Sequence, residues 1–239
     1  MSLARTIKCL ECGKEYPLSE IIYNCGDCAS KGLFRGTTDI FYDLEEAKEK
    51  YSREVLEKRK PGVWKYTELL PILDESNVVT MGEGGTPLQK CKRFADNLGM
   101  GNLYLKNETV NPTWSFKDRV FSVNISKAVE YGVDTVVLSS SGNAATAASA
   151  YSARAGLRCF ILVPGAVSIG KLTQILMYGA TVVLVEGTVV DAGVLAVQAG
   201  WEWGWYQLTT AKSLSPYQGE GSKTIAYEVC EQLGWRVPD

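Results

Sequence analysis

In the C-terminal two thirds of the chain, short apolar runs alternate with longer segments whose apolar residues recur every three or four positions. The runs are too short for helices, so they predict strands over residues 103–106, 135–139, 158–163, 180–186 and 206–209. The longer segments predict helices over residues 116–131 and up to residues 154, 178 and 199. Strands that are apolar along their whole length are typical of a parallel sheet with helices on both faces, so we predict an α/β fold.

A charged segment precedes this region. Residues 43–60 carry charges of both signs, some at i,i+4 spacing, and predict one solvated linker helix that Pro61 and Gly62 end. Residues 64–74 predict a second short helix that packs the N-terminal region onto the main body.

Residues 1–42 contain two pairs of closely spaced cysteines. Each Cys-x-x-Cys pair places two thiolates on one tight turn, and two such turns complete a tetrahedral zinc site. The predicted ligands are Cys9, Cys12, Cys25 and Cys28. Protein fills all four positions, so the zinc would be structural and the surrounding short segments would form a zinc ribbon. Two disulfides or four unbound thiols are the alternatives, and zinc is favoured over both in a reducing compartment.

Composition argues against several classes of function. A net charge of −2 gives no electrostatic basis for binding nucleic acid or an anionic membrane. We expect no transmembrane segment and no signal peptide, and the odd count of seven cysteines favours a cytoplasmic protein over a secreted one. The chain has no histidine, which excludes Ser-His-Asp and Cys-His hydrolases and imidazole acid–base chemistry.

The most informative lysine is Lys117, in the segment N-P-T-W-S-F-K-D-R at residues 111–119. An amine that attacks an aldehyde must be partly desolvated or kept near other cations, because its pKa must fall before the free base is populated. Lys117 follows Phe116 at the start of a predicted helix and precedes Arg119, which would supply such a cation. An ordinary exposed lysine at a helix start is the alternative.

A second segment, S-S-S-G-N-A-A at residues 139–145, connects a predicted strand to an alanine-rich helix. Free backbone N–H groups and the positive end of the helix dipole converge at such a junction and form an anion site. Gly142 permits close approach of a ligand to the backbone, and Asn143 offers an oriented amide. A serine-capped turn without a ligand is the alternative.

In this order, the two segments resemble pyridoxal-phosphate (PLP) enzymes of the tryptophan-synthase-β fold type, and among them threonine synthases. Three further segments resemble the same family: G-E-G-G-T-P-L at residues 82–88, L-Y-L-K-N-E at 103–108 and P-Y-Q-G-E-G-S-K-T at 216–224. The resemblance implies four parts: a zinc ribbon over 1–42, a helical linker over 43–77, a small α/β domain over 121–208, and part of a large PLP domain over 78–120 and 209–239.

The resemblance also implies roles for individual residues. Lys117 would bind the PLP aldehyde and later move protons, and Asn143 and Phe116 would contact the cofactor. The substrate would be contacted by Thr113, Ser115, Ser140, Ser141 and Gly142. The implied reaction converts the amino acid O-phosphohomoserine and water to L-threonine and phosphate. A homodimer is a further expectation from the family.

Three positions depart from the family pattern. Trp114 stands where the family usually has glycine, and Ala144 stands where a threonine often offers its hydroxyl. Gln218 stands where an arginine is common, and a neutral amide loses the charge-assisted contact with a phosphate dianion. These departures favour, as an alternative, a related PLP-dependent lyase, dehydratase or β-replacement enzyme.

Length is the largest departure. The sequence ends at Asp239, before the glycine-rich loop that would hold the PLP phosphate in the family. We therefore expect this chain to be a fragment of a longer protein whose fold lacks its C-terminal part here. A degenerate chain that binds PLP weakly or not at all is the alternative, and it would make the protein a non-catalytic, zinc-stabilised scaffold.

Overall fold

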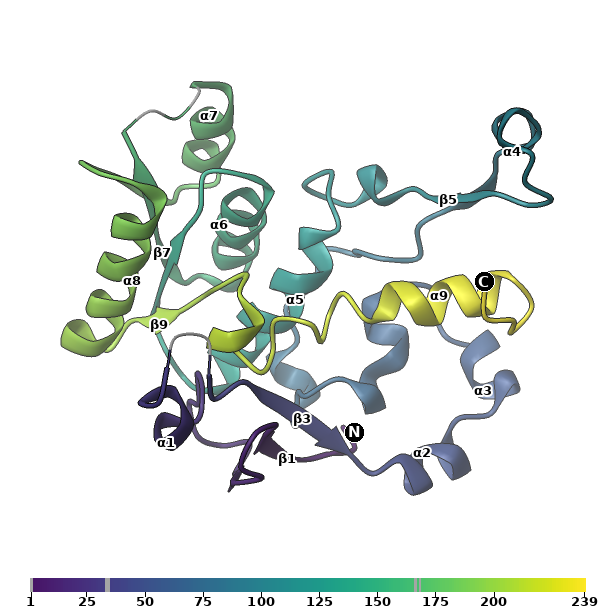
Figure 1. The fold of residues 1–239 in the computed structure, drawn as a ribbon, viewed down its shortest axis with the longest axis horizontal. Coiled ribbons are helices and arrows are strands. Elements are labelled where there is room, and N and C mark those ends of the chain that lie inside the picture. Colours follow the sequence, from purple (N-terminus) through teal and green to yellow (C-terminus); the bar gives the residue numbers. More distant parts are fainter. Residues whose placement is uncertain (1, 33–34, 166, 168) are drawn as a thin grey trace.

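The structure is a computed structural model that describes residues 2–32, 35–165, 167 and 169–239 (Figure 1). It contains a four-stranded parallel sheet in the order β8-β7-β6-β9. The strands are β6 (Thr135–Ser139), β7 (Arg158–Pro164), β8 (Thr181–Val185) and β9 (Tyr206–Gln207). The predicted α/β fold with a parallel sheet is therefore confirmed.

Helices cover both faces of this sheet. The helices α5 (Lys117–Glu130), α6 (Asn143–Ala155) and α7 (Ile169–Met177) belong to one side, and α8 (Val189–Trp203) belongs to the other (Figure 1). Side chains alternate accordingly along β6. Val136 and Leu138 join the core with α5 and α6, whereas Val137 joins Ala192 and Ala196 of α8. Period-two alternation with two covered faces explains why the strand is apolar throughout.

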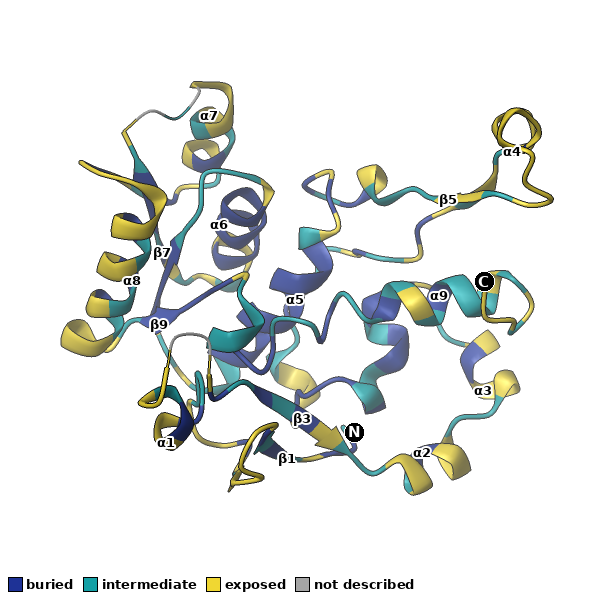
Figure 2. Ribbon diagram, viewed as in Figure 1, coloured by how far each residue is buried: buried dark blue, intermediate teal, exposed yellow. Residues whose placement is uncertain are grey.

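The edge strand β8 differs from this expectation. It forms where the apolar run predicts a strand, but only Val185 is buried and Leu184 exposes 60% of its surface. The reason is its position at the end of the strand order, where one side has no neighbour. In Figure 2 the exposed colour extends along much of α8 beside it.

The N-terminal unit is a small antiparallel sheet in the order β2-β1-β3. It comprises β1 (Ala4–Cys9), β2 (Glu15–Tyr16) and β3 (Thr38–Tyr42), with the short helix α1 (Gly26–Ala29) beside them. Short strands around two cysteine turns are what a zinc ribbon requires.

The single linker helix predicted over residues 43–60 is wrong. The structure has α2 (Leu44–Lys50) and α3 (Arg53–Glu57), and the helix is interrupted at Tyr51 (φ −96°, ψ 87°). Ser52 explains the interruption, because its hydroxyl accepts a hydrogen bond from the Val55 N–H and caps a new helix. The segment after it forms 3₁₀ turns, η1 (Val63–Leu69) and η2 (Glu75–Asn77).

An arm extends from the body on the side opposite the parallel sheet (Figure 1). It consists of the antiparallel pair β4 (Leu88–Lys90) and β5 (Tyr104–Lys106) with α4 (Lys92–Leu98) at its tip, and it returns through η3 (Glu108–Val110). The chain closes with η4 (Lys212–Leu214) and α9 (Thr224–Gln232).

A buried ionic cluster ties the arm, α5 and α9 together. Arg119 of α5 is fully buried and forms ion pairs with Glu108 (2.7 Å) and Glu228 (2.6 Å). Lys106 of the arm pairs with Glu228 as well, at 2.7 Å.

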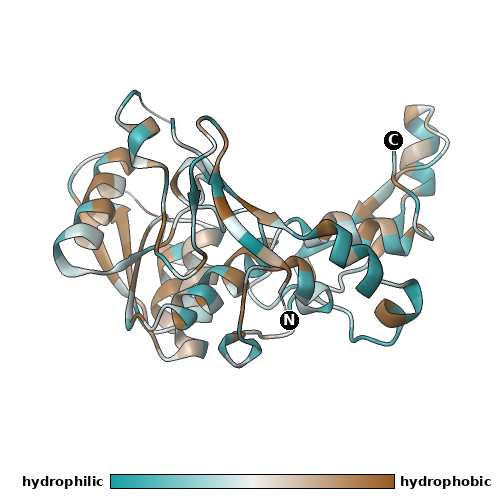
Figure 3. Ribbon diagram, turned by 90° about the horizontal axis from the view of Figure 1, so that it is seen from below, coloured by the Kyte–Doolittle hydropathy of each residue, from teal (hydrophilic) through white to brown (hydrophobic). Residues whose placement is uncertain are grey.

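Helices carry hydrophilic and hydrophobic segments side by side in Figure 3, as expected of amphipathic helices at a protein surface. Within the described ranges, no helix has both the length and the apolar character that a membrane crossing needs.

Candidate active site

Lys117 begins helix α5, directly after a loop formed by residues 111–116. Its Nζ atom lies 4.2 Å from the centre of the Phe116 ring. The side chain is half-buried, and this burial lowers the pKa of its amine. Within the described part of the chain, no carboxylate forms an ion pair with Lys117. Burial shifts the equilibrium of this amine toward its free base, the form that attacks an aldehyde.

The expectation that Arg119 is the nearby cation that lowers the pKa of Lys117 is wrong. Its guanidinium is directed to Glu108 and Glu228 in the buried ionic cluster, and the pKa of Lys117 falls through burial alone. Arg119 therefore fixes the first turn of α5 in place without tuning the amine.

Asp118 organises the loop that precedes the lysine. Its buried carboxylate accepts hydrogen bonds from the Thr113 N–H (3.1 Å), the Thr113 hydroxyl (3.0 Å) and the Ser115 N–H (3.5 Å). Burial raises the pKa of Asp118 to about 6, against the opposing effect of these hydrogen bonds. Thr113, Ser115 and Lys117 are thus held as one unit, and the Ser115 hydroxyl also accepts from the Lys117 N–H at 3.2 Å.

Trp114 has an uncommon backbone conformation with φ of 65°, in the left-handed region. A side chain at such a position costs energy that glycine avoids, which explains in physical terms why glycine suits this position of the loop. The indole exposes 70% of its surface, so it extends into solvent and does not fill the core.

The second segment lies where β6 ends and α6 begins. Among the described residues, no side chain caps the N-terminus of α6, so its first N–H groups stay available to a ligand. The Ser139 hydroxyl is buried without a hydrogen-bond partner, and the Ser140 hydroxyl accepts only weakly from Gly142 N–H, at 3.3 Å. A free helix N-terminus at the end of a parallel strand fits an anionic ligand.

The remaining predicted residues occupy the same junction. Ser141 and Gly142 are partly exposed, Asn143 is exposed at the first turn of α6, and Ala144 is buried in the core. Helices α5 and α6 pack against each other, so the lysine segment and the serine loop begin two neighbouring helices of one core.

Glu83 and Tyr151 connect these parts, and neither was predicted to have a role. Glu83 is buried and accepts hydrogen bonds from the Tyr151 hydroxyl of α6 (2.7 Å), the Met81 N–H (2.9 Å) and Trp64 (3.1 Å). The only sequence signal was the glutamate inside G-E-G-G-T-P-L. Tyr151 lies in an alanine-rich helix, where nothing in the local pattern distinguishes it from a core residue.

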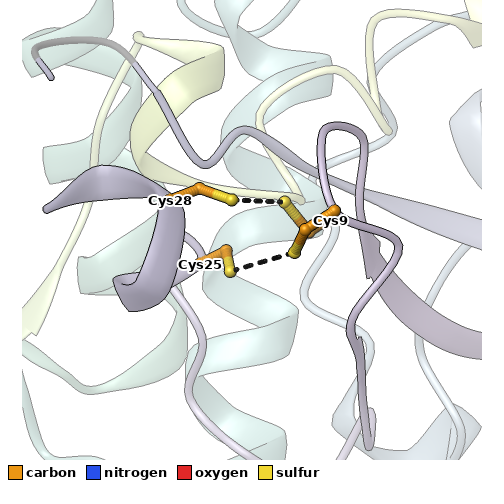
Figure 4. Close-up of side chains that lie close together, drawn as sticks. Cys9, Cys25 and Cys28 are labelled. Atoms are coloured by element: carbon orange, nitrogen blue, oxygen red, sulfur yellow. Dashed lines mark hydrogen bonds between the residues drawn. The ribbon is translucent and has the colours of Figure 1, made fainter. Parts of the chain in front are cut away.

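The four predicted zinc ligands lie together. The Sγ atoms of Cys9, Cys12, Cys25 and Cys28 are all within 4.8 Å of one another. The Sγ atoms of Cys9 and Cys28 are 3.9 Å apart (Figure 4). Those of Cys12 and Cys25 are 3.7 Å apart. Ligands about 2.3 Å from a tetrahedral zinc ion are separated by roughly 3.8 Å. The cysteine cluster therefore has the size and the donor set of a structural zinc site, and all seven cysteines are free thiols.

Comparison with known families identifies the chain. Residues 79–239 match the family described as pyridoxal-phosphate dependent enzyme. The chain belongs to this family. The matched segment begins before G-E-G-G-T-P-L and includes both the lysine segment and the serine loop.

Curated relatives narrow the similarity. The chain is 47% identical to the threonine synthase of Methanocaldococcus jannaschii and 43% identical to that of Methanosarcina acetivorans. These matches cover 97% and 98% of this chain but 55% of each relative. The chain thus spans about half the length of the curated relatives it matches.

Solved structures agree on the fold. Tomato (Solanum lycopersicum) threonine deaminase isoform 2 superimposes with a TM-score of 0.57 at 26% identity, over 62% of this chain and 40% of that one. Serine racemase from Dictyostelium discoideum gives a TM-score of 0.55 at 28% identity, over 62% and 47%.

The residues present fit part of a PLP site. A half-buried lysine without an ion-pair partner fits the aldehyde, and the uncapped start of α6 fits an anionic group. Lys117 and Asn143, which is exposed at the first turn of α6, are the residues predicted to hold the cofactor.

Proposed function

We propose that this chain carries the reactive lysine and the substrate loop of a threonine synthase, which converts O-phosphohomoserine and water to L-threonine and phosphate. The observation that carries the proposal is Lys117, a half-buried amine with a lowered pKa at the head of α5. The 47% and 43% identity to curated threonine synthases supports this reaction over others within the family.

Each group has a role that follows from its chemistry. PLP, when bound, supplies an electron sink for the carbanion. Lys117 in its neutral form would take protons from Cα and Cβ of the substrate. Phosphate leaves as the Cγ–O bond breaks, water adds at Cβ and gives up its second proton, and protons are returned to Cγ and Cα. The N–H groups at the start of α6, with Ser140, Ser141 and Gly142, hold the substrate carboxylate. Thr113 and Ser115, fixed by Asp118, line the lysine side of the site.

We also propose that zinc binds the four cysteines in a structural role. Four thiolates fill a tetrahedral shell and leave no position for substrate, so the metal would contribute to folding alone. Thiolate ligands must stay reduced, which suits a cytoplasmic enzyme. The division into residues 1–42, 43–77, 121–208 and the flanking large-domain parts, and a homodimeric assembly, belong to the same proposal.

A second candidate is a PLP-dependent dehydratase or β-replacement enzyme. Gln218 favours it, because a neutral amide binds a phosphate dianion more weakly than the arginine common at this position. A non-catalytic, zinc-stabilised scaffold is the third candidate.

One experiment separates the three. The chain is incubated with PLP and given O-phosphohomoserine, L-threonine or L-serine in parallel, and inorganic phosphate and keto acid are measured. Phosphate and L-threonine released from O-phosphohomoserine support the proposal. Keto acid from threonine or serine without phosphate release replaces it with the second candidate. If no substrate gives a product and no PLP is bound at Lys117, the third candidate, the non-catalytic scaffold, is supported.

A further inference from the structure

The segment P-Y-Q-G-E-G-S-K-T is attached directly to the N-terminal ribbon. Its Tyr217 is buried, with 1% of its surface exposed, and its ring joins the hydrophobic cluster of the ribbon itself. The other buried members of that cluster are Ala4, Ile7, Leu18 and Ile40, all from residues 1–42. An aromatic side chain from about 200 residues downstream thus completes the core of the ribbon.

Polar contacts surround this ring. The hydroxyl groups of Tyr217 and Tyr131 are hydrogen-bonded at 2.7 Å, and Tyr131 donates in turn to the ribbon carbonyl of Glu20, also at 2.7 Å. On the other side, the Asn124 amide of α5 donates to the Tyr217 carbonyl at 3.3 Å. The tyrosine is therefore fixed both to the ribbon and to α5.

Two charged contacts lie on either side of Tyr217. Lys212 pairs with the ribbon residue Asp39 at 2.7 Å and donates to the Pro216 carbonyl at 3.0 Å. Glu220 is buried and accepts a hydrogen bond from the hydroxyl of Tyr42 at the end of β3. Lys223 pairs with Glu220 at 2.7 Å and lies 4.1 Å from the centre of the Tyr42 ring.

The opposite side of the segment contacts the helix that begins with Lys117. A Cβ atom on Gly221 would lie 1.8 Å from the carbonyl oxygen of Arg119, so only glycine fits there. The segment is therefore enclosed between the ribbon and the first turn of α5, and Gln218 lies between the two contact points in sequence.

We propose that the ribbon is a socket that holds residues 212–223 against the start of α5, so that metal binding at its cysteines is coupled to the order of this segment. Tyr42, Asp39, Lys212 and Tyr217 are positioning residues in this account. This coupling between metal binding and the order of residues 212–223 does not depend on the proposed function. Only its importance for substrate binding rests on that function.

Hydrogen exchange measured by mass spectrometry tests the socket without substrate or PLP. The zinc-loaded chain is compared with two variants. Lys212→Gln removes the contacts of the ammonium group with Asp39 and Pro216, and Tyr42→Phe removes the hydroxyl contact with Glu220 and keeps the ring. The Glu220 and Lys223 amides bond within the segment at 3.2 and 3.0 Å and report its order. We expect exchange over residues 211–223 to be about fivefold faster in each variant, with no change in β6 and β7.

Lys48→Gln is the matched control, because it removes an ion pair of the same length (Lys48–Glu45, 2.7 Å) on helix α2, away from both the cysteines and the segment. It should leave residues 211–223 unchanged. Removing zinc with a chelator should accelerate exchange in residues 4–42 and 211–223 more than in β6 and β7. Unchanged exchange over 211–223 in both variants overturns the proposal. So does equal acceleration of β6 and β7 on chelation, because the ribbon would then stabilise the whole chain without acting on this segment.

This outcome is independent of catalysis. If the socket exists but Lys117 does not bind PLP, the exchange result stands and the proposed function fails. If Lys117 binds PLP while residues 211–223 show no response, the proposed function stands and the socket fails.

Discussion

Replacing Arg119 by methionine tests the buried ionic cluster. The change removes a fully buried guanidinium and leaves Glu108 and Glu228 facing each other without it; their side chains expose only 16% and 5%. Breaking a buried ion pair by removing one partner costs about 3–5 kcal/mol. Lys106 still pairs with Glu228 at 2.7 Å, so we expect the lower end of this range, about 3 kcal/mol.

The matched control is Arg158→Met. Arg158 pairs with Asp134 at 2.9 Å, but the two side chains expose 65% and 80%. Exposed ion pairs contribute about 0–1 kcal/mol, so this variant should unfold at nearly the wild-type urea concentration. Urea unfolding at neutral pH measures both free energies of unfolding, with the slope against urea as a check that the same surface is exposed.

The loss of stability in Arg119→Met should depend on pH. Burial alone would raise the pKa values of Glu108 and Glu228, but Arg119 and the other hydrogen-bond donors around them together outweigh it and hold both below their ordinary value of 4.5. Their stabilisation is therefore present above pH 4.5 and is lost as the pH falls through their lower folded-state pKa values. The deficit of Arg119→Met should be largest near neutral pH and narrow below pH 4.5. A deficit equal to that of Arg158→Met, or one constant with pH, refutes the reasoning.

Three further predictions concern the loop and the ribbon. Trp114→Gly should be more stable than Trp114→Ala by about 0.5–1 kcal/mol, because relief of the left-handed backbone outweighs the flexibility of glycine. If thermal unfolding showed the alanine variant to be the more stable one, backbone strain at this position would be contradicted. Burial raises the pKa of Asp118 from 3.8 to about 6, so its contribution to stability is complete below pH 3.8 and is lost as the pH rises through 6. The stability of wild type relative to Asp118→Asn should therefore decrease across this interval, and a flat difference would count against a buried carboxyl. Cys12→Ser should reduce zinc retained after dialysis, measured by metal analysis, from one ion per chain to a substoichiometric amount, whereas Cys91→Ser should not.

Local sequence predicted those parts of the fold that depend on local patterns. The strand over residues 135–139 and the helix from residue 117 follow from apolar periodicity, and the four-cysteine cluster follows from the spacing of its turns. The break at Tyr51 was missed because charge periodicity continues through it, although Ser52 is an ordinary capping residue.

The contacts within the site could not be read from the sequence, because they join residues far apart in the chain. Arg119 meets Glu228, Glu83 meets Tyr151, and Tyr217 enters the ribbon core. Each partner lies in a different element, and only the fold brings the two together. Adjacent opposite charges in the sequence do not reveal the actual partners. Asp118 bonds to the loop before Lys117, whereas Arg119 pairs with Glu108.

The central claim is that Lys117 is the amine that binds PLP, and chemical trapping tests it most directly. The chain is incubated with PLP, reduced with borohydride, digested and mapped by mass spectrometry, alongside Lys117→Ala and the exposed-lysine control Lys92→Met. The account predicts one modified lysine, Lys117, with label lost in Lys117→Ala and retained in Lys92→Met. Label spread over exposed lysines, and unchanged by Lys117→Ala, would contradict it.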